Sequence, residues 1–163
     1  MSSRKFVKEK FGLEKIISGG QTGVDRFALD AAMEAGISVG GWCPLGRRSE
    51  DGTIPEKYPL IETDSKNYPV RTFMNVRDSD ATLIFSAGEP SGGTAMTVEF
   101  AVRENKPFLI IDSTFYEPEG ASEHLHAWLI KIKPCVLNVA GPRLSQAPDV
   151  AAFAKIVIKS LLR

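Results

Sequence analysis

Short apolar runs alternate with segments of helical periodicity along most of the chain. The first such pair begins at Ile16 and Ile17, two β-branched residues that lead into the small and polar stretch SGGQTG. Apolar side chains then recur at the spacing of one helix face, at Val24, Phe27, Ala28, Ala31, Ala32 and Ala35. This pattern predicts a strand over residues 16–18, a glycine-rich turn and a helix that begins near Gly23.

The same layout occurs again in the middle of the chain. Residues 81–86 form a nearly continuous apolar run, which is typical of a strand covered on both faces. The run ends in a second glycine-rich stretch, residues 87–94, and a helical pattern follows to about residue 105. Two strand–turn–helix units of this kind carry more weight than either one alone.

The rest of the chain continues the alternation. Further strands are predicted at 37–42, 58–63, 107–112 and 135–140, and further helices at 69–78, 119–132 and 148–162. Strands separated by helices indicate a mainly parallel sheet with right-handed crossovers and helices on both faces. We therefore expect residues 1–163 to form one domain with a three-layer, doubly wound α/β fold and the strand order 3-2-1-4-5-6.

The first 14 residues leave two alternatives open. Basic residues surround three apolar ones there: Arg4, Lys5, Lys8 and Lys10 lie among Phe6, Val7 and Phe11. The segment is either a short amphipathic helix that docks on the domain or on a neighbouring subunit, or a flexible tail.

The composition is that of an ordinary globular protein, with 43% hydrophobic and 25% charged residues. Lys and Arg number 20 and Asp and Glu also number 20, so no net positive charge attracts nucleic acid. No apolar run is long enough to cross a membrane or to act as a signal peptide. We therefore expect a cytoplasmic protein whose partner is neither nucleic acid nor membrane.

No metal site is expected from the cysteines and histidines. Cys43 and Cys135 lack the CxxC spacing of zinc ligands, and His124 and His126 fall on different sides of a predicted helix. Cys43 is more typical of a small buried residue than of a reactive thiolate.

Both glycine-rich turns favour an anion. Glycine permits positive φ and close approach to a ligand, and the first N–H groups of a helix have no intrahelical partner. Because ligands of doubly wound sheets bind beyond the carboxyl ends of the strands, we expect a crevice between the strands at 16–18 and 81–86, with one turn on either side. The alternative for the first turn is a tight connection without a ligand, since it lacks the GxGxxG spacing.

Residues 43–55 form a long loop rich in Gly and Pro, which is typical of a functional loop. Within it, Arg47 and Arg48 have the guanidinium geometry to clamp a phosphate or a carboxylate. Equally, they could pair with Glu50 and Asp51 on the surface and contribute little.

Four sequence blocks resemble those of a known family. SGGQTGVDR, GGWCPLGRRSEDGTIP, NVRDSDATLIFS and SGGTAMT are similar, in this order, to the molybdenum carrier family, the molybdenum-cofactor carrier proteins, and the resemblance extends over about residues 16–112. That family looks related to a wider Rossmann-like group, which includes cytokinin-activating phosphoribohydrolases often labelled lysine decarboxylases. The resemblance implies a Rossmann-like fold, a homodimer or homotetramer, and a phosphorylated ligand that is pterin- or nucleotide-like. The molybdenum cofactor (molybdopterin) is the candidate.

The residues expected to hold this ligand come from both turns and from four arginines. One wall of the crevice would consist of Ser18, Gly19, Gly20, Gln21, Thr22 and Gly23, and the other of Gly92, Gly93 and Thr94. The candidates for fixed positive charge are Arg47, Arg48, Arg71 and Arg77. Asp25 and Glu99 are carboxylates near helix starts, where the dipole stabilises the ionised form by roughly 0.3–1 kcal/mol, and this stabilisation is the alternative explanation of both.

Catalysis would depend on Glu99. The phosphoribohydrolases carry a GGxGTxxE turn, and the corresponding stretch here runs from Gly92 to Glu99, with Ala95 and Met96 in place of Gly and Thr. A hydrolase would use Glu99 to activate water or to stabilise a ribosyl cation. Because the Gly-Thr pair is missing, we favour a non-catalytic carrier, with a nucleotide-derivative sensor and a phosphoribohydrolase-like N-glycosidase as alternatives.

Overall fold

A computed structural model describes all residues of the chain, 1–163. Strands and helices alternate along it, as the sequence pattern predicts. The elements in chain order are α1 (Ser3–Phe11), β1 (Lys15–Ile17), α2 (Val24–Glu34), β2 (Ser38–Gly40), β3 (Trp42–Cys43), β4 (Arg48–Ser49), β5 (Gly52–Thr53), β6 (Ile61–Glu62), α3 (Tyr68–Arg77), β7 (Ala81–Ser86), α4 (Gly92–Arg103), β8 (Phe108–Asp112), α5 (Pro118–Ile132), β9 (Val136–Ala140) and α6 (Pro148–Leu161).

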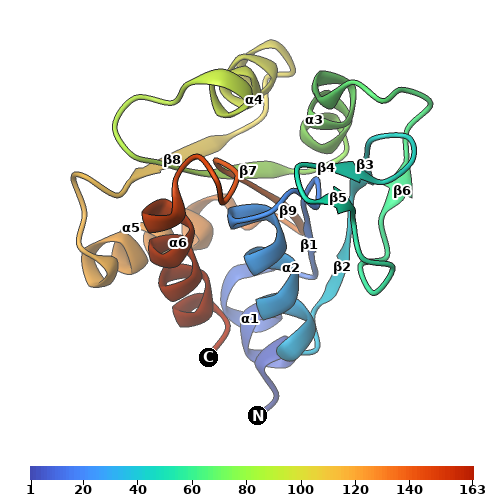
Figure 1. Ribbon diagram of the computed structural model, residues 1–163. Coiled ribbons are helices and arrows are strands. Elements are labelled where there is room, and N and C mark those ends of the chain that lie inside the picture. Colours follow the sequence, from blue (N-terminus) through green and yellow to red (C-terminus); the bar gives the residue numbers. More distant parts are fainter.

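Five strands form a central parallel sheet in the order β2-β1-β9-β7-β8. Helices cover both of its faces: α3 and α4 lie side by side on one face, and α1, α2, α5 and α6 lie on the other (Figure 1). All six residues of β7 are buried, which explains its continuous apolar run. The predicted three-layer, Rossmann-like α/β fold is confirmed.

The predicted strand order, 3-2-1-4-5-6, is wrong in the position of the last strand. The sequence order places β9 at an edge of the sheet, whereas it lies between β1 and β7. Its buried centre fits this place, because Leu137, Asn138 and Val139 are covered and Asn138 Nδ2 donates to Thr82 Oγ1 of β7 at 3.3 Å. The edge strand on this side of the sheet is β8, and most of its residues are only half-buried. The crevice therefore has three strand ends beneath it, and the loop after β9 lies between the two glycine-rich turns.

The strands predicted at 37–42 and 58–63 are shorter than expected. Only the first part of 37–42, which is β2, belongs to the central sheet, and the strand predicted at 58–63 is β6, which lies outside it. Gly41, with φ of 128°, separates β2 from β3, and β3 pairs in parallel with β6 as a separate two-stranded sheet. The loop 43–55 contains an antiparallel hairpin, in which Arg48 pairs with Thr53. Under this hairpin lies a small apolar cluster that includes Cys43, and burial raises the pKa of the Cys43 thiol. Cys43 is therefore the small buried residue that the sequence favours.

The N-terminal segment forms a helix packed on the rest of the chain. Val7 and Phe11 of α1 are fully buried and belong to the main apolar cluster of 24 residues, and α1 contacts α5. Ser2 caps the helix through a hydrogen bond from the Lys5 N–H, and Gly12 ends it with φ of 75°. Of the two alternatives for this segment, the structure has the docked helix.

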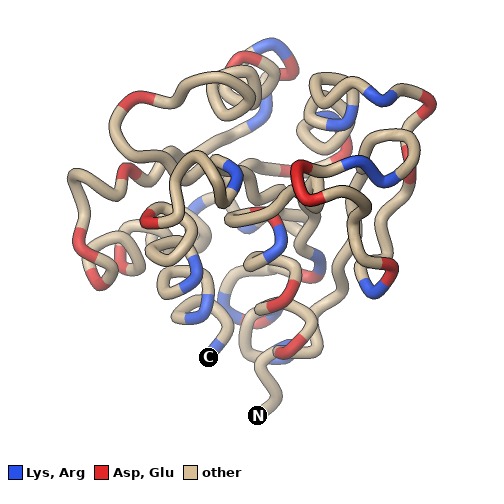
Figure 2. The backbone as a smooth tube through the Cα atoms, in the orientation of Figure 1, with Lys and Arg blue, Asp and Glu red and all other residues tan.

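Basic and acidic residues are interspersed along the backbone (Figure 2). None of the helices combines the length and the apolar character that a transmembrane segment requires.

Gly41 offers a test of how closely the β2–β3 connection approaches β1. A Cβ at Gly41 would stand 2.2 Å from the Ser18 carbonyl oxygen, whereas one at Gly52, with a similar φ of 112°, would meet nothing within 4 Å. We expect Gly52→Ala to lower the free energy of unfolding by about 1–2 kcal/mol through backbone strain alone. Gly41→Ala should lower it by about 1–3 kcal/mol more, because the backbone must move. Urea unfolding measures both, and equal losses would contradict the close approach.

Candidate functional site

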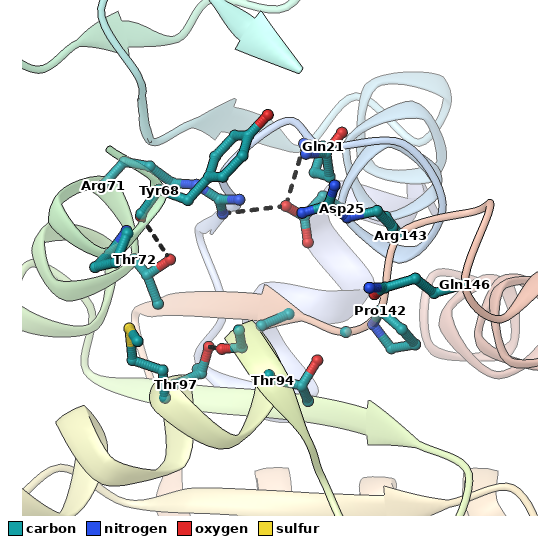
Figure 3. A pocket seen from close by; sticks show the side chains of 16 residues that line it. Gln21, Asp25, Tyr68, Arg71, Thr72, Thr94, Thr97, Pro142, Arg143 and Gln146 are labelled. Carbon is teal, nitrogen blue, oxygen red and sulfur yellow. Dashed lines mark hydrogen bonds and ion pairs between the residues drawn. The ribbon is translucent and has the colours of Figure 1, made fainter. Parts of the chain in front are cut away.

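A cavity of about 360 Å³ lies beyond the carboxyl ends of the central strands. Four segments line it, as Figure 3 shows: the turn after β1, the start of α3, the start of α4 and the loop after β9. Its lining residues are Gln21, Asp25, Tyr68, Pro69, Arg71, Thr72, Gly92, Gly93, Thr94, Met96, Thr97, Ala140, Gly141, Pro142, Arg143 and Gln146. Residues of both glycine-rich turns thus lie at one cavity, and the loop after β9 adds a third wall.

Within the first turn, the residues predicted as one wall have different roles. Gln21 lines the cavity, whereas a Cβ at Gly20 would stand 2.5 Å from Leu60 and one at Gly23 would stand 2.8 Å from the Leu144 nitrogen. Ser18 is buried, and its hydroxyl donates to the Asp25 carbonyl oxygen at 3.1 Å. Gly20 and Gly23 therefore permit close packing of the turn, and their φ angles are positive, 73° and 83°.

Gln21 is a buried side chain with one unused donor. Its Oε1 accepts from the N–H groups of Thr22 at 3.1 Å and Glu50 at 3.0 Å. Its Nε2 is buried and has no hydrogen-bond partner in the chain. A buried donor without an acceptor costs about 1–3 kcal/mol, so this atom marks a place where a further acceptor would be favourable.

Asp25, in the first turn of α2, is the buried carboxylate of the site. Its Oδ2 accepts from the Gln21 N–H at 3.2 Å and lies 3.5 Å from Arg71 Nη1 (Figure 3). Burial raises the pKa of Asp25 to about 6, although Arg71 and the Gln21 N–H oppose this change. Arg71 also lies against Gly19, where a Cβ would stand 1.9 Å from Nη1. Gly19 therefore makes room for the arginine.

The second turn opens α4 directly into the cavity. Ser91 is the N-cap residue, but its side chain makes no capping hydrogen bond. Nothing lies within 4 Å of a Cβ placed at Gly92 or Gly93, so the chain leaves open space beside the first residues of the helix, whose N–H groups have no intrahelical partner. Thr94 and Thr97 lie one turn apart and line the same side of the cavity (Figure 3).

Four of the charged residues predicted for the site do not line the cavity. Arg47 donates to the backbone carbonyl oxygens of residues 54, 55, 58 and 60 and so holds its own loop together. Arg77 lies at the end of α3, with Nε 2.8 Å from Asp78 Oδ1. Glu99 is exposed on α4. Arg48 also lies outside the lining, but its guanidinium stands 4.6 Å from the ring centre of Tyr68.

Arg47 and Arg48 do not form the surface ion pairs with Glu50 and Asp51 that the sequence left open. Asp51 instead pairs with Arg26, whose Nη1 and Nη2 donate to the carboxylate at 2.7 and 2.8 Å. Glu50 accepts from the hydroxyls of Thr22 and Ser145 and from the Ser145 N–H at 3.2 Å. These hydrogen bonds, led by the Ser145 hydroxyl, hold the pKa of Glu50 below its usual range. The loop after β9 is thus fixed on the first turn through Glu50.

The loop after β9 and Tyr68 at the start of α3 were not predicted from the sequence, although Arg71 of α3 was. Tyr68, Arg143 and Gln146 line the cavity, and the Arg143 guanidinium stands 5.4 Å from the Tyr68 ring centre. The available signal was Gly141-Pro142, which follows an apolar run in the same way as the two recognised turns. That signal is informative only if β9 is placed in the middle of the sheet.

The site therefore combines arginines, an open helix start and a buried carboxylate. No three His, Cys, Asp or Glu side chains are grouped where they could hold a metal ion. An arrangement of guanidinium groups and free helix N–H groups is suited to binding an anion such as a phosphate.

Asp25 predicts a pH dependence of stability. Between its ordinary pKa of 3.8 and the raised value of about 6, the folded protein binds a proton at Asp25 that the unfolded chain has released. The contribution of this group to the free energy of unfolding is therefore present at low pH and is lost as the pH rises from about 4 to 6. The loss is about 3 kcal/mol, from a shift of about two units at roughly 1.4 kcal/mol each.

Asp25→Asn removes this titration. The free energy of unfolding of this variant lacks the loss that the parent undergoes as the pH rises. The difference between variant and parent should therefore change in favour of the variant by about 3 kcal/mol between pH 4 and pH 7. Urea unfolding across this range measures the difference, with Asp64→Asn, a change at an exposed aspartate, as the matched control. Parallel pH profiles of the parent and Asp25→Asn would show that Asp25 keeps its ordinary pKa.

Comparisons with known proteins agree with the fold and with the sequence blocks. The fold is similar to the crystal structure of a "Putative molybdenum carrier protein" from Syntrophus aciditrophicus SB, with a TM-score of 0.90 and 43% sequence identity, covering 93% of this chain and 96% of that chain. No curated protein matches the chain. Residues 16–162, which include every residue that lines the cavity, match the model of the circularly permutated YpsA SLOG family. The chain belongs to the circularly permutated YpsA SLOG family.

Proposed function

We propose that the protein binds a phosphorylated, pterin- or nucleotide-like small molecule in this cavity and carries it without chemical change. The observation that supports this proposal is that the open start of α4 lines the same cavity as Arg71 and Arg143. The molybdenum cofactor is the candidate ligand, because the similar crystal structure bears the name of a molybdenum carrier protein.

The phosphate would rest at the start of α4. The N–H groups of Gly92 and Gly93 precede the first intrahelical hydrogen bonds, and the helix dipole adds partial positive charge at this end. Arg71 and Arg143 supply full positive charges on other walls of the cavity (Figure 3). Because guanidinium groups and helix N–H groups both favour an anion, their meeting at one cavity supports a phosphorylated ligand over a neutral one.

The remaining polar atoms suit a ligand that carries further acceptors. Gln21 Nε2 and Arg71 Nε are buried donors without partners in the chain. Ligand oxygens or ordered water at these points would satisfy them. Such donors would suit the phosphate end and polar edge of a molybdopterin-like ligand. The protein has no group of three His, Cys, Asp or Glu side chains that could hold a metal ion. In this proposal the molybdenum is bound by the pterin.

The position of Glu99 supports a carrier over a hydrolase. Glu99 is exposed on α4 and does not line the cavity. The carboxylate that does line it, Asp25, lies against Arg71 and accepts a hydrogen bond from the Gln21 N–H. A general base must come within hydrogen-bond reach of the proton it removes, and Glu99 lacks that access.

A variant pair at two glycines tests the proposal. Gly93 and Gly120 each lie in the first turn of a helix, α4 and α5, and a Cβ at either would meet no atom closer than 3.8 Å. Gly93→Val fills the open start of α4, whereas Gly120→Val makes the same change away from the cavity. Mass spectrometry of gently purified protein should find a phosphorylated compound on the parent and on Gly120→Val, but not on Gly93→Val. Equal retention by Gly93→Val would place the ligand elsewhere.

We also propose that the protein acts as a homodimer or homotetramer, as the family resemblance implies. Symmetric assembly is the commonest state of oligomeric proteins. Sedimentation equilibrium at micromolar concentration should therefore give a mass two or four times that of the 17.8 kDa chain. A mass equal to that of one chain would refute the assembly without affecting the ligand proposal.

A further inference from the structure

Three arginines gather around the ring of Tyr68 at one end of the cavity. The guanidinium carbons of Arg48, Arg143 and Arg71 stand 4.6, 5.4 and 5.5 Å from its centre. They come from β4, the loop after β9 and α3, which are far apart in sequence. We refer to Arg48, Arg71 and Arg143 as the arginine cluster. A single cation–π contact is a weak attraction at an exposed site. Like charges gathered near one ring repel one another, so attraction to the ring alone does not account for three cations.

The nearby carboxylates do not neutralise the cluster. Asp25 Oδ2 lies 3.5 Å from Arg71 Nη1, and Glu50 Oε2 lies 3.8 Å from Arg143 Nε. Both separations exceed those of a charge-assisted hydrogen bond, and both carboxylates already accept hydrogen bonds from other groups. Three positive charges therefore face two negative charges, which leaves an excess of positive charge.

The cluster also has unused hydrogen-bond donors. Arg71 Nε is buried without a partner, and Arg143 contacts Glu50 and the Tyr68 ring but donates no hydrogen bond. Arg48 donates only to the Lys66 carbonyl oxygen, at 3.1 Å. Arg26 is a contrasting case, since its guanidinium donates four hydrogen bonds, to Gly20, Ser49 and Asp51. The guanidinium donors of an arginine that only stabilises the fold are paired in this way, whereas those of the arginine cluster are largely unpaired.

We propose that the arginine cluster is a second anion subsite and that the ligand is a diphosphate ester. One phosphate rests at the start of α4 and the other at the cluster. The inference rests on the proposed function, because Arg71 and Arg143 line the same cavity as Gly92 and Gly93. A volume of about 360 Å³ falls within the range of sites that enclose whole small molecules, so it has room for two linked phosphates.

The neutral part of the ligand extends into an adjoining cavity of about 420 Å³. Gly92, Thr94, Pro142 and Gln146 line both cavities, so the start of α4 lies between them. The second cavity is lined by Glu89 and by no Lys or Arg. Its charge disfavours a phosphate there and assigns the anionic part of the ligand to the side of the arginine cluster.

Calorimetry with inorganic phosphate and inorganic pyrophosphate separates the two subsites. We expect the parent to bind pyrophosphate at least about tenfold more tightly than phosphate, because the second phosphate accepts charge-assisted hydrogen bonds at the arginine cluster. Arg143→Gln should bring the affinity for pyrophosphate down to near that for phosphate and should weaken phosphate binding much less. Arg143→Lys should restore part of the difference through its charge. Arg77→Gln, a change outside the cavity, controls for the general loss of one positive charge and should alter neither affinity.

The outcomes distinguish this inference from the proposed function. If phosphate binds and is lost in Gly93→Val, while pyrophosphate gains nothing from Arg143, the second subsite is wrong and the phosphate site stands. If Arg143→Gln weakens both anions equally, the two groups share one subsite and the inference is overturned. If neither anion binds the parent, or Gly93→Val binds both unchanged, the inference and the proposed function both fail.

Discussion

The cavity depends on a buried ion pair, in which Asp25 at the start of α2 meets Arg71 of α3. The carboxylate also accepts the Gln21 N–H, so one group closes the turn after β1 and holds the helix that faces it. Gly19 lies beneath the arginine because any Cβ there would occupy the guanidinium position. Removing one partner from a buried pair leaves an uncompensated charge, so the turn, the glycine and α3 are constrained together.

The long loop at residues 43–55 serves this arrangement mainly as a support. Arg47 binds four carbonyl oxygens of the segment that follows it, and Asp51 binds both Nη atoms of Arg26 on α2. Glu50 ties the loop after β9 to Thr22, and it thereby positions the segment that carries Arg143. A loop rich in charge can thus support a cavity that none of its own residues lines. Arg48 reaches the site indirectly, through the ring of Tyr68.

The sheet order explains why the cavity has more walls than two glycine-rich turns provide. The chain runs from β1 outward to β2, crosses to β7 and β8, and returns to place β9 between β1 and β7. The loop after β9 consequently emerges between the two turns, and its Gly141 packs against Val24, where a Cβ would clash at 2.7 Å. Arg143 and Gln146 enter the cavity from this central position. An edge position for β9 would have left the site without them.

Local sequence pattern determined the elements, the fold class and both glycine-rich turns. Helical periodicity from Val24 onward reflects a helix that is buried on one face, and the apolar run at residues 81–86 reflects a strand that is buried on both faces. Both patterns therefore report burial directly. The resemblance in four blocks identified the family, and the turns led to Gln21 and to the start of α4. The roles of the charged residues could not be predicted from local sequence. Nothing local separates Arg47, which binds backbone oxygens, from Arg48, which stacks on Tyr68, or Glu99 on the outer face of α4 from Asp25 at the cavity. Strand order and the meeting of Arg48, Arg71 and Arg143 around one ring arise from contacts between residues distant in sequence. Such contacts leave no periodic trace in the chain, so only the tertiary structure decided them.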